Sequence, residues 1–381
     1  MAKAPLDGLK VLEMARILAG PWIGQVLADL GATVIKVESP AGDDTRGWGP
    51  PFIERGADPS AAYFYTCNRG KRSIAIDFTT PEGQGQIREL AREADVLIEN
   101  FKVGGLKKYG LDYDSLKKLN PALIYCSITG FGQDGPYASR AGYDYLVQGM
   151  AGLMSITGEE GGQPYKVGVA VTDIVAGLYG AVGITSALHQ RATTGLGQQI
   201  DISLFDSATA LLANQAMNYL ATGVSPTRLG NHHPNIVPYQ VFDVADGQVI
   251  VAAGNDGQYV RLCKVLGQPE LGTDPRFAKN RDRVAARQEL IATLAKLIAP
   301  WSRERFLAAL EDAVVPAAPI NSVADVFADP QILFRGMQIA PDGVPGVRTP
   351  IAMSDSDLSL DRTAPELDED GAAIRARGWD I

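Results

Sequence analysis

One aspartate, Asp173, stands where a carboxylate is able to act as a nucleophile. It follows Thr172 and precedes small residues that predict a closely packed helix over 172–195, namely Ala176, Gly177, Gly180 and Ala181. The dipole of a helix N-terminus favours an ionised carboxylate, and such a carboxylate can attack an activated acyl group. The same residues are also an ordinary helix start, with Thr172 as the cap and Asp173 complementing the dipole. Both interpretations remain open on these residues alone.

The histidines and cysteines offer less chemistry. His189 lies late in the predicted helix and is interpreted as structural, whereas His232 and His233 are adjacent and lack the spacing of a helical metal pair. Three cysteines are scattered without a CxxC pair: Cys67, Cys126 and Cys263. We therefore expect no metal site and no disulfide framework, and a reducing cytoplasmic compartment fits best.

Composition narrows the class of protein. The 381 residues are 46% hydrophobic and 21% charged, with a net charge of −9. This charge argues against non-specific binding to nucleic acid or to an anionic membrane. The most apolar stretch, 174–188, is about 15 residues long, whereas a membrane span needs about 20, so it is expected to be a buried helix.

Strands and helices alternate along the first part of the chain, and these elements must position Asp173 and the other candidate residues. A strand at 9–15, a helix from Pro21 to Leu30 and a strand at 32–38 predict a βαβ unit. Strand-like and helix-like segments then alternate at 72–78, 81–94, 95–101, 113–120 and 122–132, which predicts an α/β, Rossmann-like domain. No GxGxxG follows the first strand, which argues against a nicotinamide-dependent dehydrogenase.

The chain is longer than one core usually serves, so two domains are expected. Residues 198–223 predict a strand and a second long helix, and 241–254 a hairpin with an Asp-Gly turn. We expect a large Rossmann-like domain at 1–200, completed by 330–381, a linker helix at 201–225 and a small α+β domain at 226–329. The acidic tail from Asp355 is expected to be loosely packed.

Several sequence runs resemble one family. VLEMARILAGPWIGQVLADLGATVIKVESPAGDDTRGW opens the chain, and NRGKRSIAIDF, VLIENFKVGGLKKYGLDY, RAGYDYLVQGMAGLM, GVAVTDIVAGLYG and RLGNHHPNIVPYQVF follow in order. Over about residues 8–340, the chain resembles the class III CoA-transferases (the CaiB/BaiF family, similar to formyl-CoA and carnitine CoA-transferases). The resemblance implies an enzyme that moves coenzyme A from an acyl-CoA to a carboxylic acid, with no permanently bound cofactor. It also implies a homodimer of interlocked rings.

The resemblance implies roles for particular residues. It makes Asp173 the covalent nucleophile, with support from Tyr143, Asp144, Gln148 and the substrate-facing Trp48. A mobile loop over the intermediate corresponds to Gly254, Asn255, Asp256, Gly257 and Gln258, although this loop has fewer glycines than is usual in the family. The CoA site corresponds to Arg16, Leu18, Asn100, Phe101 and Lys108, and Lys71 and Arg72 are expected partners of CoA phosphates.

Departures from the family's pattern bear on the substrate. Formyl-CoA transferase has glutamine, arginine and lysine where this chain has Leu18, Ser39 and Ala141, which weakens the case for formate and oxalate. Because succinyl-CoA is a frequent donor in the family, a dicarboxylate acceptor is the expectation. An α-methylacyl-CoA racemase would need a histidine where Tyr143 stands, and tyrosine, with a pKa near 10, is a poor base. A non-catalytic CoA-binding protein is the other alternative.

Overall fold

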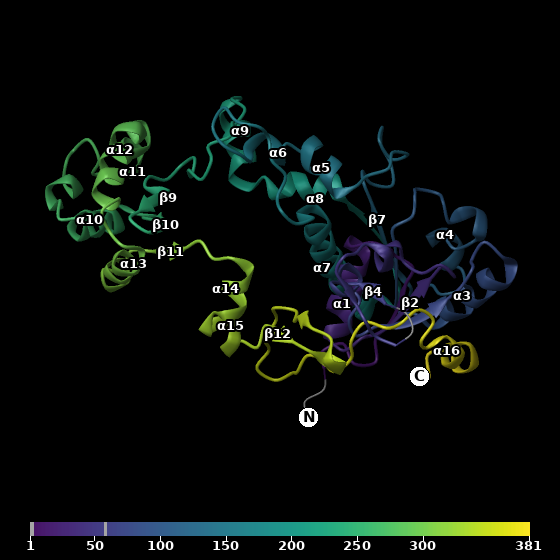
Figure 1. The fold of residues 1–381 in the computed structure, drawn as a ribbon. Helices are drawn as coiled ribbons and strands as arrows, with labels where there is room; N and C mark the ends of the chain where they lie inside the picture. Colours follow the sequence, from purple (N-terminus) through teal and green to yellow (C-terminus); the bar gives the residue numbers. More distant parts are fainter. Residues whose placement is uncertain (1–3, 57–58) are drawn as a thin grey trace. The chain divides into compact units, whose positions relative to one another are not determined.

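The computed structural model describes residues 4–56 and 59–381, which divide into two compact units. Unit 1 comprises the described residues up to Met154 together with Lys166–Ser225 and Pro330–Ile381. Unit 2 comprises Ser155–Tyr165 and Pro226–Asp329. The last segment of the chain, yellow in Figure 1, returns to the purple N-terminal part of unit 1.

A six-stranded parallel sheet forms the centre of unit 1. Its strands lie in the order β5-β2-β1-β6-β7-β8. They are β1 (Lys10–Glu13), β2 (Thr33–Glu38), β5 (Arg72–Ala75), β6 (Val96–Glu99), β7 (Ile124–Thr129) and β8 (Gln199–Ser203). In the middle of the sheet, Leu12 is paired in register with Ile35 on one side and Leu97 on the other. The central strands β1 and β6 are almost wholly buried, as expected of strands that are covered on both faces.

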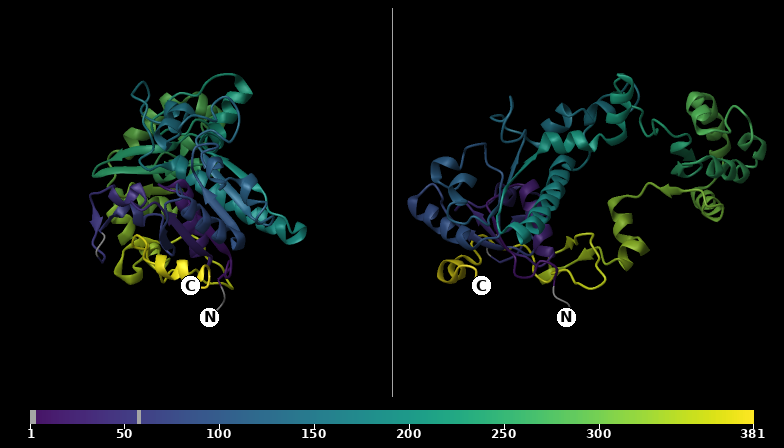
Figure 2. Two further views of the ribbon diagram at one scale, coloured as in Figure 1. Left: turned by 90° about the vertical axis from the view of Figure 1, so that its right-hand side faces the viewer. Right: turned by 180° about the vertical axis from the view of Figure 1, so that it is seen from behind.

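Helices cover the two faces of this sheet, as the views in Figure 2 show. On one face, α1 (Ala19–Asp29), α7 (Val171–Thr194) and α8 (Leu204–Leu211) pack into one apolar cluster. On the other, α3 (Pro81–Glu93), α4 (Tyr113–Leu116) and α16 (Gly371–Arg377) join a second cluster. The expectation of an α/β fold with a parallel sheet is confirmed.

Small residues bring α7 close to α1. A Cβ atom at Gly180 would lie 2.4 Å from Ile23 Cδ1, and one at Gly177 would lie 3.0 Å from the carbonyl oxygen of Ala19. By length and composition alone α7 is able to cross a membrane, but this is weak evidence, since core helices pass the same test. Its residues Ala176, Ala181 and Ile184 are buried in the core cluster shared with α1.

The chain after β8 differs from the single long helix expected there. Ala213 adopts a left-handed conformation with φ of 45°, and the segment divides into α8 and α9 (Ala213–Thr222). Helix α6 (Leu153–Ile156) spans the boundary between the two units in the sequence. Unit 1 also contains short elements: α2 (Ala62–Tyr65), α5 (Asp144–Met150), α15 (Pro330–Phe334), and the two-stranded ribbons β3–β4 (Phe52–Ile53, Ser60–Ala61) and β12–β13 (Gln338–Ile339, Gly346–Val347).

Unit 2 has its own sheet and core. The expected hairpin is present as β9 (Tyr239–Val244) and β10 (Gly247–Ala252), joined by Ala245 and Asp246, with Gly247 at positive φ as the first residue of β10. Strand β11 (Ala317–Pro319) pairs with β10 on its other side. The helices are α10 (Asp256–Val265), α11 (Asn280–Ala285), α12 (Arg287–Ile298), α13 (Arg303–Asp312) and α14 (Val323–Ala328).

The C-terminal tail is not loosely packed, so that expectation is wrong. Ile374 and Trp379 are 3% and 7% exposed, and the Trp379 indole N–H donates to the Leu90 carbonyl at 3.0 Å. Asp370 forms an ion pair with Arg362 at 2.8 Å and another with Arg72 at 3.2 Å. Asp370, one of the acidic residues that suggested a solvated tail, thus pairs with two arginines of the same unit.

Candidate active site

Asp173 lies in the first turn of α7, and a neighbouring helix supplies the cap. Ala170 occupies the cap position and contributes no side-chain hydrogen bond. Instead Asp144, in the first turn of α5, accepts hydrogen bonds from the Thr172 backbone N–H at 2.8 Å and the Thr172 hydroxyl at 2.5 Å. The prediction that Thr172 is the cap was therefore wrong, since its hydroxyl donates to Asp144.

A buried glutamine fixes this cap. The Gln148 side-chain amide donates to Asp144 Oδ2 at 2.7 Å, and its carbonyl accepts from the Val167 backbone N–H at 2.9 Å. Gln148 is fully buried, so these bonds are shielded from competing water. Asp144 and Gln148 consequently set the position at which α7 begins and Asp173 is presented.

The electrostatic surroundings of Asp173 are unusual for a helix start. Burial, and after it the negative charge of Asp144, raise the pKa of Asp173 to about 7. No cation within the described parts of the chain contributes to this shift. The sequence had suggested a carboxylate held ionised by the helix dipole. In the structure, the recessed position of the side chain and the neighbouring acid instead bring the pKa of Asp173 close to neutral pH. Carboxyls with such a shift are common at catalytic sites.

Tyr63 belongs to the same neighbourhood and was missed by sequence reasoning. Burial raises its pKa to about 12, and the charges of Asp173 and Asp144 contribute further. Trp48, expected to face the substrate, packs edge-on against Tyr63 with ring centroids 5.3 Å apart. Tyr143 is the residue before α5 and is 63% exposed, and its supporting role stays a prediction.

The residues expected at the CoA site gather at the carboxyl ends of β1 and β6. Asn100 binds the backbone of Arg16 twice, accepting from its N–H at 2.9 Å and donating to its carbonyl at 2.7 Å. The guanidinium of Arg16 lies 5.4 Å from the centre of the Phe101 ring. Leu18, two positions after Arg16, is buried at the start of α1.

An aromatic row extends from this point. Phe78 lies between Phe101 and Tyr109, with ring centroids 5.4 Å apart on each side. The Lys108 ammonium lies 4.6 Å from the Tyr109 ring, so Arg16 and Lys108 flank the row at its two ends. Rings bordered by cations suit a ligand that carries both a planar base and phosphates.

Two of the expected phosphate ligands have other partners. Lys71 is completely buried, and its ammonium contacts Glu13 at 2.8 Å, the Pro21 carbonyl at 2.9 Å and Asn68 at 2.8 Å. Arg72 pairs with Asp370 of the C-terminal segment. Complete burial corrects the assignment of Lys71 to CoA phosphates, whereas Arg72, whose side chain is 30% exposed, keeps that assignment as a prediction.

The segment expected as a mobile loop lies in unit 2 and is largely helical. Gly254 and Asn255 precede α10, and the Asn255 side chain caps the helix by accepting from the Gln258 N–H at 2.9 Å. Asp256 is bound by the buried Arg283 at 2.9 Å. Three of the five residues, Asp256, Gly257 and Gln258, thus form the first turn of α10.

Within unit 1, His189 lies far from Asp173. His189 is sixteen positions further along α7, about 24 Å at the rise of an α-helix. His232 and His233 belong to unit 2. No group of three or more metal-binding side chains is found in the parts of the chain that the structure describes.

Unit 1 is thus an α/β fold in which a doubly covered parallel sheet presents a recessed carboxyl, Asp173, at a helix start. The model of CoA-transferase family III matches residues 6–371, and the chain belongs to this family. It is thus a CoA-transferase, which acts on an acyl-CoA and a carboxylic acid.

Relatives with assigned activities support this conclusion. The chain is 56% identical over 382 residues to the succinate–glutarate CoA-transferase of Agrobacterium fabrum, covering 98% of this chain and 96% of that protein. It is 44% identical over 334 residues to the succinyl-CoA:glutarate CoA-transferase of Mus musculus, covering 87% and 76%. The crystal structure of a CaiB/BaiF family protein from Brucella suis is 62% identical, covers 99% of both chains and superposes with a TM-score of 0.89.

Proposed function

We propose that this enzyme transfers coenzyme A between succinate and a five-carbon dicarboxylate such as glutarate, through covalent intermediates on Asp173. The observation that carries the proposal is a raised-pKa carboxyl in the first turn of α7, oriented by Asp144, in a chain 56% identical to a succinate–glutarate CoA-transferase.

The first half-reaction forms an aspartyl thioester. A carboxylate oxygen of Asp173 attacks the thioester carbonyl of the donor, the C–S bond breaks, and CoA leaves as a thiolate. The thiolate then attacks the Asp173 carbonyl carbon of the mixed anhydride, which releases succinate and leaves CoA bound to Asp173. The second half-reaction repeats these steps in reverse order with the acceptor carboxylate and regenerates Asp173.

This sequence of steps needs no net proton transfer and no external energy source, because one thioester replaces another. It requires stabilisation of the oxyanions and exclusion of water from the anhydride. The Tyr63 phenol, whose high pKa keeps it protonated at neutral pH, is a suitable hydrogen-bond donor in this neighbourhood. Phe101 and its aromatic row, with Arg16 and Lys108, are assigned to the nucleotide part of CoA.

The specific test is a matrix of donors and acceptors with purified protein. Succinyl-CoA and glutaryl-CoA should each react with the other's free acid, and mass spectrometry should show the exchanged thioester. Formate and oxalate should be poor acceptors. Failure of every dicarboxylate combination, with activity on monocarboxylates, would contradict the substrate class and leave the family assignment intact.

An interlocked homodimer in the cytoplasm completes the proposal. Several large apolar side chains of unit 1 are exposed to solvent when the chain is considered alone. Leu220 is 72% exposed and Phe334 is 86% exposed. Exposed apolar residues of this size commonly mark a protein interface. The three cysteines are free and buried, in keeping with a reducing compartment. Light scattering should give twice the chain mass, and a stable monomer at low micromolar concentration would contradict the dimer.

A further inference from the structure

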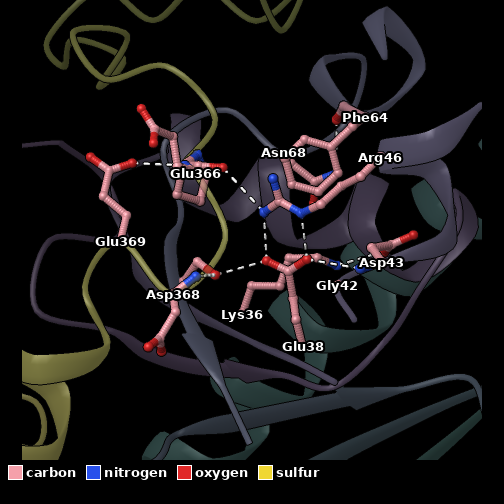
Figure 3. Close-up of polar contacts among 12 residues, drawn as sticks. Lys36, Glu38, Gly42, Asp43, Arg46, Phe64, Asn68, Glu366, Asp368 and Glu369 are labelled. Carbon is pink, nitrogen blue, oxygen red and sulfur yellow. Dashed lines mark hydrogen bonds and ion pairs between the residues drawn. The ribbon is translucent and has the colours of Figure 1, made fainter. Parts of the chain in front are cut away.

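A cluster of fully buried charges lies beneath the start of α1. Lys36 on β2 is 0% exposed, and its ammonium lies 3.2 Å from Glu13 and 3.0 Å from Asp43. Beside it, Arg46 donates twice to Glu38, at 2.8 and 2.6 Å, as Figure 3 shows. Burial of this kind is costly for each ion, so the arrangement persists only because the charges are paired.

One member of this cluster reaches a strained loop. Asp43 accepts hydrogen bonds from the Thr45 backbone N–H at 3.0 Å and its hydroxyl at 2.8 Å, and its two oxygens lie 3.4 and 3.3 Å from the Ile17 N–H. Ile17 has φ of 71°, the left-handed region. For a β-branched residue this conformation is rare and costs about 1–3 kcal/mol, so surrounding contacts must hold it.

The remaining polar groups of the loop are held as well. Asn100 binds both backbone groups of Arg16, and the Cys67 thiol donates to the Ile17 carbonyl at 3.5 Å. The loop opens α1, where the Ala19 carbonyl closely approaches Gly177, one turn after Asp173. Its conformation therefore determines the shape of the wall next to the candidate nucleophile.

We propose that Asp43, held by Lys36 and Thr45, is a positioning residue that keeps Ile17 in its left-handed conformation and so preforms the CoA-binding loop Arg16–Leu18. This inference rests on the proposed function for the identity of the ligand. Asp43 acts through the loop backbone, and its carboxylate is already occupied by donors from the chain itself. Preorganisation of this kind improves binding because the ligand need not order the loop.

The test compares Asp43→Asn with a matched buried aspartate. Every group that Asp43 binds is a donor, so an amide at this position turns its NH2 group toward a donor in either orientation. We expect the Kd for CoA, measured by calorimetry, to rise about 10-fold, which corresponds to about 1.4 kcal/mol. The control is Asp29→Asn, which disrupts the equally buried pair with Arg69 at the opposite end of α1. It should lower the melting temperature with CoA affinity unchanged.

A second substitution addresses the strain directly. Glycine adopts positive φ readily, so Ile17→Gly added to Asp43→Asn should restore at least half of the lost binding free energy. If Asp43→Asn fails to fold, Thr45→Val, which removes only the 2.8 Å hydroxyl bond, should give a smaller rise in Kd with the same rescue.

The outcomes separate this inference from the proposed function. Unchanged CoA affinity in the folded Asp43 and Thr45 variants, or an equal loss in Asp29→Asn, would overturn the positioning role. So would the absence of rescue by Ile17→Gly. A wild-type protein that binds CoA and transfers it between no dicarboxylates would instead contradict the proposed function, because calorimetry does not depend on turnover.

Discussion

Two regions of unit 1 bury carboxyl groups and treat them in opposite ways. Beneath α1, burial would raise the pKa of Glu38 and Asp43, but Arg46 and Lys36 respectively hold both pKa values below the ordinary range. At the start of α7, burial and Asp144 raise the pKa of Asp173 to about 7, with no cation to oppose them among the described residues. Asp173 is only partly buried, whereas Glu38 and Asp43 are 3% and 2% exposed, so the cationic partner and not the degree of burial decides the direction of the shift.

This contrast separates carboxyls that the protein stabilises with a cation from those that it leaves without one. A buried carboxylate with a paired cation is already stabilised by the protein and gains little from attacking an acyl group. A buried carboxyl without a cation is stabilised much less, so its anion is a better nucleophile once it forms. The paired carboxylates beneath α1 therefore have a structural role in the candidate active site. Asp173, which has no cationic partner, is the carboxyl suited to react there.

The largest expected effect comes from removing the unpaired carboxyl. Asp173→Asn and Asp173→Ala should fold and bind CoA but lose transfer by about 1,000-fold or more, because the reaction path is deleted. Hydroxylamine added with acyl-CoA should leave a hydroxamate on the wild-type peptide that holds Asp173 and none on the variants. The control is Asp206→Ala in the first turn of α8, an exposed helix-start aspartate whose loss should cost only about 0.3–1 kcal/mol of stability.

A single rate decides between the two interpretations of Asp173. An Asp173→Ala protein that retains more than about a tenth of the wild-type rate would contradict the covalent mechanism. Asp173 would then be a helix-start residue like Asp206, and the contrast between the two regions would lose its functional meaning.

Removing a cation from the buried cluster beneath α1 should lower the stability of the protein. Lys36→Met leaves Asp43 without its cation and Glu13 with Lys71 alone, all inside the protein. We expect the free energy of unfolding, measured with urea, to fall by about 3–5 kcal/mol. Lys117→Met is the matched control, since its pair with Asp114 is exposed and should contribute little to stability. Equal effects of the two substitutions would show that the buried cluster contributes no more than a surface pair.

Local sequence patterns predicted the elements that carry the site. The alternation of strands and helices identified the parallel sheet, and the small residues after Asp173 indicated that α7 packs closely against a neighbour, which the structure shows to be α1. Both signals depend on residues a few positions apart. They consequently gave the helix that presents Asp173, although not the contacts that tune it.

Local sequence patterns could not predict contacts between residues that are far apart in the sequence. Lys71 and Arg72 stand in a basic run that is typical of a surface, yet their carboxylate partners lie 58 and 298 positions away. The cap of α7 comes from Asp144, 28 positions before Thr172, and the sequence therefore suggested Thr172 itself. The raised pKa of Asp173 follows from these tertiary contacts and from burial, neither of which a helix-start motif reveals.

The smallest expected effect is a shift in pH dependence. Only ionised Asp173 attacks the thioester, so the transfer rate should rise with pH to a midpoint near 7 and fall about tenfold per unit below it. Asp144→Asn removes the neighbouring negative charge, which should move this midpoint to lower pH. The amide also turns an NH2 group toward Thr172 or Gln148, so a loss of about 0.5–2 kcal/mol in stability should accompany the shift.

Glu99 provides the control for the pH dependence of the transfer rate. Burial raises its pKa to about 7 as well, and it accepts a hydrogen bond from the Phe101 N–H at 2.8 Å. Glu99→Gln should weaken CoA binding through that turn and leave the midpoint of the maximal rate in place, because Glu99 does not attack the substrate. If the midpoint followed Glu99 and ignored Asp144, the titrating group would be Glu99. The assignment of the near-neutral pKa to the nucleophile would then be wrong, even with Asp173 essential.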